Sequence, residues 1–293
     1  MKLAMTAMLG LLFAPAAFAG EPVNMKTDTD ANGSVSIDVT RGEVTIVAWS
    51  KNEVTVEGTR DDNSEEFVFR REDKTVYIED EISHRRGRGN GTKITVHVPV
   101  NNDVKLEGVS TSVSVAGVKG EVGIEVVSGN VKAEKLGGRV KIETVSGNID
   151  LKGGEGNISL EAVSGSVKAE TSATRLNASS VSGDVEVINR AAVGHAEVST
   201  VSGDLELTSP VSADLDLELG SISGDITFNV VGDLDAKVEV ETGPGGRIDN
   251  RLNDVEPDRE RFTGAETLRT KIGKGSGYIE ASVISGRISL RRK

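Results

Sequence analysis

A four-residue phrase, Val or Ile followed by Ser, Gly and a polar residue, occurs seven times in this chain. The copies begin at Val127, Val145, Val163, Val181, Val201, Ile222 and Ile284. The first four begin at equal intervals, and the next two steps, to Val201 and to Ile222, are slightly longer. A fixed period of this kind is typical of stacked supersecondary units, whose architecture is specified by the repeat. The phrase therefore constrains the shape of the protein more than its activity.

Between the copies, apolar and polar residues alternate with a period of two, which predicts half-buried strands. In one unit, residues 131–134 alternate in this way, Gly137 and Gly138 follow, and residues 140–143 alternate again. The glycines supply the positive φ values that tight corners require. Each unit of the repeat therefore predicts two short strands and two turns.

Two topologies fit this pattern: coils stacked in parallel, or an antiparallel meander. The outward charges at one position alternate in sign along the repeats, from Lys132 to Asp150, Lys168 and Glu186. Opposite charges on laterally adjacent strands contribute roughly 0.2–1 kcal/mol per pair, so this alternation favours residues one period apart as neighbours. A meander would also leave its apolar face uncovered. We expect an all-β fold, a single-stranded parallel β-solenoid (β-helix-like) with coils of about 18–21 residues.

The same register predicts the interior of the solenoid. Apolar residues one coil apart would form one column on each wall, and burying each side chain fully would contribute roughly 1.5–3 kcal/mol. The first column is Val131, Ile149, Val167, Val185 and Leu205, and the second is Val140, Ile158 and Leu176. Aromatic residues make up only 3% of the chain, which suits the thin interior of a solenoid.

The chain divides into three expected parts. Residues 1–19 have the features of a secretory signal peptide: Lys2, a short apolar run, and a small-x-small site ending at Ala19. Residues 20–107 are rich in strand patterns but less regular, and we interpret them as a β cap or the first coils. Residues 108–293 form the repeat region, interrupted by an irregular loop over 243–264. No later apolar run is long enough to span a membrane.

Composition excludes several classes of function. The formal net charge is -12, which disfavours binding to the phosphate backbone of nucleic acids and favours a self-repelling surface or a cationic partner. Cysteine is absent, which excludes disulfides and thiolate chemistry. With the signal peptide, these features predict a periplasmic or extracellular protein without a transmembrane segment in its mature form.

The chain resembles the bacterial putative-adhesin family of β-strand-repeat envelope proteins. The resemblance rests on the repeated phrase, on the segments 42–49 and 54–58, and on the closing Ile284-Ser285-Gly286, and it covers most of the mature chain. It implies a strand-repeat architecture and possible roles in adhesion or envelope-stress sensing, but no known chemistry. The longer repeats after Val181 and the segment 243–264 depart from the regular pattern.

One column of acidic residues is a candidate metal site. Asp184, Asp204 and Asp225 follow Gly in successive copies, so their carboxylates would lie about 4.8 Å apart. Bound Ca²⁺ would relieve their repulsion, because it prefers several oxygen ligands. The alternative is that Asp suits the turn, as Asn130 and Asn148 do in the same column. We favour the turn.

A basic, glycine-rich segment is the other candidate site. Arg85, Arg86 and Arg88 could bind an anionic glycan or lipid headgroup, although a hairpin tip is the simpler interpretation. No pattern predicts a catalytic residue or a cofactor, because the three histidines are scattered and are not tied to a serine by any motif.

These observations favour an exported, non-enzymatic structural or adhesin-like binding protein of the bacterial cell envelope, whose partner is another envelope protein or a polysaccharide. The alternative is a polysaccharide-active lyase or hydrolase on a β-helix scaffold. Such enzymes usually need long loops that wall a cleft, whereas the coils here are short and Trp49 is the only tryptophan.

Overall fold

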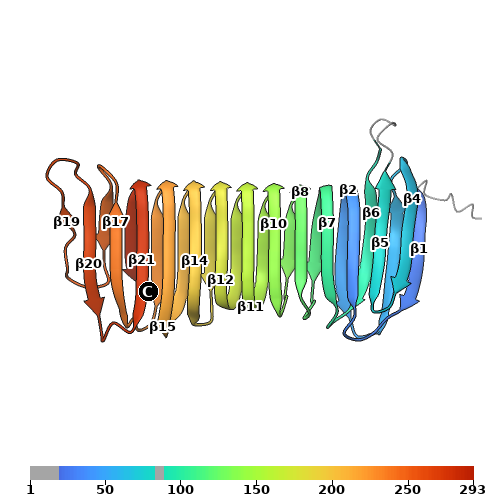
Figure 1. Ribbon diagram of the computed structural model, residues 1–293, viewed down its shortest axis with the longest axis horizontal. Helices are drawn as coiled ribbons and strands as arrows, with labels where there is room; N and C mark the ends of the chain where they lie inside the picture. The colour runs from blue at the N-terminus through green and yellow to red at the C-terminus, as the bar shows by residue number, and fades with distance from the viewer. Residues whose placement is uncertain (1–19, 83–88) are drawn as a thin grey trace, which may run out of the picture.

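The computed structural model describes residues 20–82 and 89–293, and in this part of the chain it contains strands and no helix (Figure 1). The strands, in chain order, are β1 (Glu21–Asp28), β2 (Ser34–Trp49), β3 (Glu53–Arg60), β4 (Ser64–Glu72), β5 (Thr75–Ile82), β6 (Thr92–Pro99), β7 (Asp103–Ala116), β8 (Val122–Ser128), β9 (Val131–Glu134), β10 (Arg139–Ser146), β11 (Ile149–Ser164), β12 (Val167–Ser182), β13 (Val185–Asn189), β14 (Val193–Ser202), β15 (Leu205–Ser223), β16 (Ile226–Val231), β17 (Ala236–Thr242), β18 (Arg247–Asn250), β19 (Asp258–Arg259), β20 (Glu266–Ile272), β21 (Gly277–Ser285) and β22 (Arg287–Arg292). The expected all-β class is confirmed. The expected signal peptide, residues 1–19, lies outside the described residues.

Residues one repeat apart are lateral neighbours in parallel strands. Asp150 of β11 pairs with Lys132 of β9 on one side and with Lys168 of β12 on the other. Lys168 pairs in turn with Glu186 of β13, and their side chains form an ion pair of 2.8 Å. The alternation of charge along the repeat therefore corresponds to pairs of opposite charge across a parallel ladder.

The core lies between two walls of stacked strands. The column expected on the first wall is present: Val131, Ile149, Val167, Val185 and Leu205 are paired in succession and are buried. The column expected on the second wall is also present, with Val140 beside Ile158 and Ile158 beside Leu176. Apart from Phe228, the fully buried apolar side chains of the stack are aliphatic, in keeping with the low aromatic content.

The first regular coil is preceded in space by a strand from much earlier in the chain. β2 pairs in parallel with β7, so that Val35 lies beside Val104 and Val44 beside Val113. On its other side β2 pairs in parallel with β5 and β6. Antiparallel pairs then finish this end, β4 with β5, β3 with β6 and β1 with β3. The region 20–107 thus adds β2, β5 and β6 to the parallel stack, and antiparallel strands β1, β3 and β4 beyond them (Figure 1).

The last repeat is inserted into the stack and does not lie at its end. β21 pairs in parallel with β15, and β22 pairs with β16, so that Leu217 lies beside Ile279 and Ile226 beside Ile288. β17 and β18 precede β21 in the chain; β17 pairs with the outer side of β21, and β18 pairs with that of β22. β20 then adds an antiparallel strand beyond β17 (Figure 1). The segment expected to be an irregular loop, 243–264, contains β18 and the short β19.

A buried ion pair connects elements of the N-terminal region. The guanidinium of Arg41 in β2 donates to both carboxylate oxygens of Asp61, at 2.6 and 3.0 Å. The Asp61 side chain is fully buried and also accepts hydrogen bonds from the backbone N–H groups of Asn63 and Gly91. The Arg41 guanidinium lowers the pKa of Asp61; burial raises it, and the two backbone N–H groups lower it further.

We expect Asp61→Asn to reduce the free energy of unfolding at pH 7 by about 3 kcal/mol, since it leaves a partly buried guanidinium without its counterion. A lowered pKa in the fold means that the stabilisation is complete above the unfolded-state pKa of about 3.9 and is lost as the pH falls through the folded-state value. Denaturant unfolding of the unsubstituted protein and of Asp61→Asn from pH 7 to pH 2 should therefore show that the difference between their free energies of unfolding shrinks only below about pH 4. The exposed neighbour provides the control: Asp62→Asn should have a much smaller effect. An equal loss from both substitutions would contradict this role of Asp61.

Candidate binding groove

The carboxylates of the expected metal column accept backbone hydrogen bonds from the next coil. The Asp184 carboxylate accepts a hydrogen bond from the backbone N–H of Asp204 at 2.9 Å. In the same way, Asp204 accepts a hydrogen bond from the N–H of Asp225 at 2.8 Å, and Asp225 accepts one from the N–H of Arg287 at 2.9 Å. Earlier in the same column, the Asn130 and Asn148 side chains accept the same type of bond at 2.9 Å. Within residues 20–82 and 89–293, no group of three or more His, Asp or Glu residues is arranged to hold a metal ion. This geometry supports the turn interpretation, which a calcium titration still has to test.

We expect Asp184→Asn to be nearly neutral, because an amide oxygen makes the same bond at Asn130 and Asn148. Asp184→Ala should reduce the free energy of unfolding by about 1 kcal/mol, since it leaves the Asp204 N–H without its acceptor. Thermal unfolding with and without millimolar Ca²⁺ measures both effects. A large calcium-dependent rise in the melting temperature that Asp184→Asn abolishes would instead support the metal site.

The other expected site, Arg85, Arg86 and Arg88, lies outside the described residues. Its proposed binding of an anionic glycan or lipid therefore remains a prediction.

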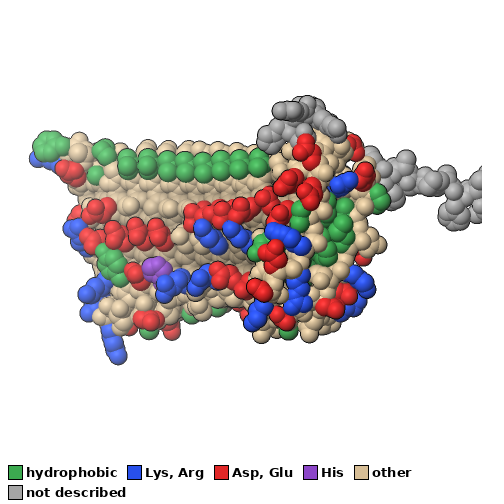
Figure 2. Space-filling view, turned by 45° about the vertical axis from the view of Figure 1, so that its right-hand side comes forward, with side chains coloured by type: hydrophobic (Ala, Val, Ile, Leu, Met, Phe, Trp, Pro, Cys, Tyr) green, Lys and Arg blue, Asp and Glu red, His purple; other side chains and the backbone are tan. Residues whose placement is uncertain are grey.

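A row of exposed apolar side chains runs along one face of the stack. Its members are the first residues of the repeated phrase together with the equivalent Val109, each 40–60% exposed: Val109, Val127, Val145, Val163, Val181, Val201, Ile222 and Ile284. The serine that follows each of these apolar residues pairs with its equivalent on the next strand, such as Ser146 with Ser164 and Ser223 with Ser285. The apolar residues therefore lie in one column. Figure 2 shows hydrophobic side chains in a continuous line along this face. We call these eight residues the apolar row.

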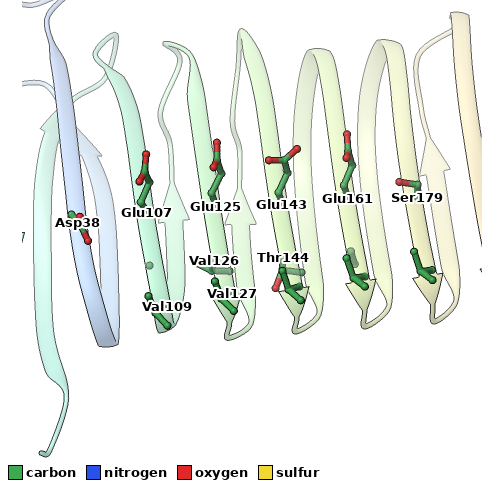
Figure 3. Close-up of a pocket in the computed structure, with 15 residues that line it drawn as sticks. Asp38, Glu107, Val109, Glu125, Val126, Val127, Glu143, Thr144, Glu161 and Ser179 are labelled. Atoms are coloured by element: carbon green, nitrogen blue, oxygen red, sulfur yellow. The ribbon is translucent and has the colours of Figure 1, made fainter. Parts of the chain in front are cut away.

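A row of carboxylates lies beside the apolar row on the same wall. Lateral pairing of the strands places five carboxylates side by side, in the order Asp38, Glu107, Glu125, Glu143 and Glu161. Figure 3 shows the four glutamates pointing to the same side of the wall, one per coil. We call these five residues the acidic row. The two rows line a groove of about 600 Å³, and Val109, Val127, Val145, Val163 and Val181 form its apolar side.

The acidic row is only partly neutralised by nearby lysines. Lys105 lies 2.5 Å from Glu107 and Lys141 lies 2.8 Å from Glu143. The hydrogen bond that each lysine donates to its glutamate, and in second place the negative charge of that glutamate, raise the pKa of both lysines, so the lysines remain protonated. At one end of the row, burial and then the charges of Glu107 and Glu79 raise the pKa of Asp38.

Three carboxylates of the row have no ion-pair partner. Among the described residues, Asp38, Glu125 and Glu161 form no ion pair, although the charges of Glu125 and Glu161 contribute to the raised pKa of Lys141. The Glu161 carboxylate accepts a hydrogen bond from Ser159 at 3.2 Å. Like charges on adjacent strands are destabilising, so the row is an arrangement that folding alone does not favour.

Sequence reasoning missed both rows, although a signal for each was present. Glu107, Glu125, Glu143 and Glu161 are spaced at the repeat period, like the charges that were used to infer the register. The phrase Val-Ser-Gly does not by itself show whether its valine faces the core or solvent. In β8 the neighbouring Val126 takes the inward position, which leaves Val127 outside.

The fold and the groove together define a class: an all-β repeat protein with a long ordered surface. Within this class, the family described as Toastrack DUF4097 matches residues 32–256, and the chain belongs to that family. No curated protein matches the chain.

Several solved structures are similar to this one at low sequence identity. A "putative adhesin" from Parabacteroides distasonis ATCC 8503 is 15% identical, with a TM-score of 0.51 over 92% of this chain and 97% of that one. A "putative adhesin" from Bacteroides fragilis NCTC 9343 is 11% identical, with a TM-score of 0.45 over 92% and 97%. A "putative lipid binding protein" from Parabacteroides distasonis is 15% identical, with a TM-score of 0.39 over the same shares. At 15% identity, the similarity to the first of these structures, with its TM-score of 0.51, concerns the fold alone.

Proposed function

We propose that this protein is an exported, non-enzymatic binding protein of the bacterial cell envelope, with an adhesin-like role. Its scaffold is a single-stranded parallel β-solenoid with coils of about 18–21 residues. In the chain, the regular solenoid is preceded by residues 20–107, which form a β cap or the first coils, and by a cleaved signal peptide of residues 1–19. The mature protein is periplasmic or extracellular. Residues 20–82 and 89–293 contain no helix long and apolar enough to cross a membrane.

The observation that carries this proposal is the apolar row. Soluble proteins rarely expose large contiguous apolar patches, and where they do the patch commonly marks an interaction site. Eight aliphatic side chains in one column at about 4.8 Å spacing extend about 34 Å. The structure described as a putative adhesin that shares this fold, with a TM-score of 0.51, is in keeping with a binding role.

The arrangement of the carboxylates argues against the alternative of a polysaccharide-active enzyme. Glycosidases place two carboxyl groups on opposite sides of the scissile bond, with one of them raised in pKa to act as the acid. Here the glutamates form a row along a single wall, and two of them are paired with lysines. The lining of the groove contains no aromatic side chain on which a sugar could stack.

Two measurements test the proposal. Cell fractionation with an antibody against the protein should find the processed chain in the envelope or medium, and affinity capture from the native envelope fraction should retain a specific partner. Hydrolase or lyase activity on common envelope glycans, lost on substitution of Glu125 or Glu161, would overturn the non-enzymatic role.

A further inference from the structure

We propose that the groove between the apolar row and the acidic row binds an amphipathic, cationic helix of a partner protein. This inference rests on the proposed binding role and specifies the chemistry of the partner. The helix would place Lys or Arg side chains against the acidic row and aliphatic side chains against the apolar row.

Charge complementarity selects a cationic partner. The acidic row carries five carboxylates at about one strand spacing, and among the residues that the structure describes only Lys105 and Lys141 form ion pairs with it. Glu125 and Glu161, which form no ion pair among the described residues, lie on either side of Glu143. A ligand that brings cations to these two positions would relieve repulsion as well as gain attraction.

The apolar row selects a partner with an apolar face as well. Val127, Val145 and Val163 are 45–47% exposed, and a bound side chain would bury much of that remaining area. A small cation or a hydrophilic basic chain would satisfy the carboxylates and leave this row in water. The ligand must therefore carry both kinds of side chain in neighbouring stripes, which is the pattern of an amphipathic helix.

The spacing of the rows favours a helix over an extended segment. Coils repeat at about 4.8 Å. A helix presents a side chain to one line about every 5.4 Å, once per turn, whereas same-face residues of a strand are about 6.6 Å apart. A helix lying along the groove can thus offer roughly one basic and one apolar side chain to each coil, and flexible lysine side chains absorb the small mismatch.

The same features disfavour a second copy of this chain as the occupant. A copy seated on the groove would bring its own acidic row and a formal charge of -12 against carboxylates that are already crowded. An anionic membrane surface would be repelled for the same reason.

The test uses a synthetic peptide of about 18 residues, or about 27 Å as a helix, with Lys in one stripe and Leu in the next. Binding to the whole protein is measured by calorimetry at two salt concentrations. We expect the double variant Glu125→Gln, Glu161→Gln to weaken binding about tenfold and to reduce its salt dependence. The double variant Val145→Ser, Val163→Ser should also weaken binding about tenfold, without changing the salt dependence.

Matched controls separate the groove from the overall charge and surface. Glu186→Gln with Glu170→Gln removes two charges from the other wall, and Val255→Ser removes an exposed valine outside the groove; none of these should change the affinity. Replacing the Lys residues of the peptide by Glu, or its Leu residues by Ser, should abolish binding. All substituted side chains are exposed or half-buried, and a melting temperature close to that of the unsubstituted protein would confirm folding.

Three results would overturn the inference: no binding of the peptide, equal losses in groove and control variants, or self-association that the Val145→Ser, Val163→Ser variant abolishes. The last would identify a second copy as the occupant. Affinity capture from the envelope fraction distinguishes failure of the helix-binding inference from failure of the proposed function. If the groove variants retain the same partner as the unsubstituted protein, the protein has a binding role that does not use the groove. If the unsubstituted protein retains no partner, the binding role itself is contradicted.

Discussion

Replacing Ile149 by Asp is expected to unfold the repeat region. Ile149 is 1% exposed and lies between Val131 and Val167 in one column of the core. The substitution removes a buried aliphatic side chain and places a carboxylate among buried aliphatic side chains. We expect a loss of about 5 kcal/mol or more, which approaches the whole stability of an ordinary domain.

Circular dichroism during heating measures this effect, and Val181→Asp provides the control. Val181 belongs to the same repeat architecture but is 45% exposed, so a carboxylate there stays hydrated and should cost about 1 kcal/mol or less. Because each coil contacts only its neighbours, the Ile149 variant should lose structure cooperatively around β11 first. Equal melting temperatures for the two variants would show that the inward and outward positions have been assigned wrongly.

Replacing Gly165 by Ala is expected to cost about 3 kcal/mol or more, although it adds only one methyl group. Gly165 has a φ of +154°, and a Cβ atom at this position would lie 1.9 Å from the carbonyl oxygen of Gly147 in the preceding coil. That oxygen belongs to the backbone and cannot rotate away, so relief requires the two coils to separate at the corner. The hydrogen bond from the Gly165 N–H to the carbonyl of Ser182 at 3.0 Å lies at the same corner and would be strained as well.

Gly123 supplies a matched control for the glycine prediction. It lies within β8, and a Cβ atom added there would have no other heavy atom within 4 Å. Gly123→Ala should therefore be neutral, or slightly stabilising because alanine reduces the freedom of the unfolded chain. Denaturant unfolding of the two variants compares the same chemical change in two settings. A loss at Gly165 no larger than at Gly123 would contradict the close approach of the corners.

Much of the architecture was predictable because it is local and periodic. The alternation of Val131, Ala133 and their equivalents specifies which face of each strand is buried. The change of sign from Lys132 to Asp150 and Lys168 indicates parallel neighbours, and the pairing confirms it. The acidic row has the same kind of signal, since Glu125, Glu143 and Glu161 share the repeat period. A column of like charges, however, runs against the preference of neighbouring strands for opposite charges, so the period alone does not predict it.

The sequence by itself determined the repeat period and the inward columns, because each depends on interactions within one coil or between consecutive coils. Only the tertiary structure decided the order of the outer coils. Ile284 completes the apolar row because β21 inserts beside β15, and Val35 lies beside Val104 because β2 joins the stack ahead of β7. These contacts join segments that are several repeats apart in the chain. At such separations many strands of similar pattern compete for one edge, and the choice depends on which packing buries every edge at once.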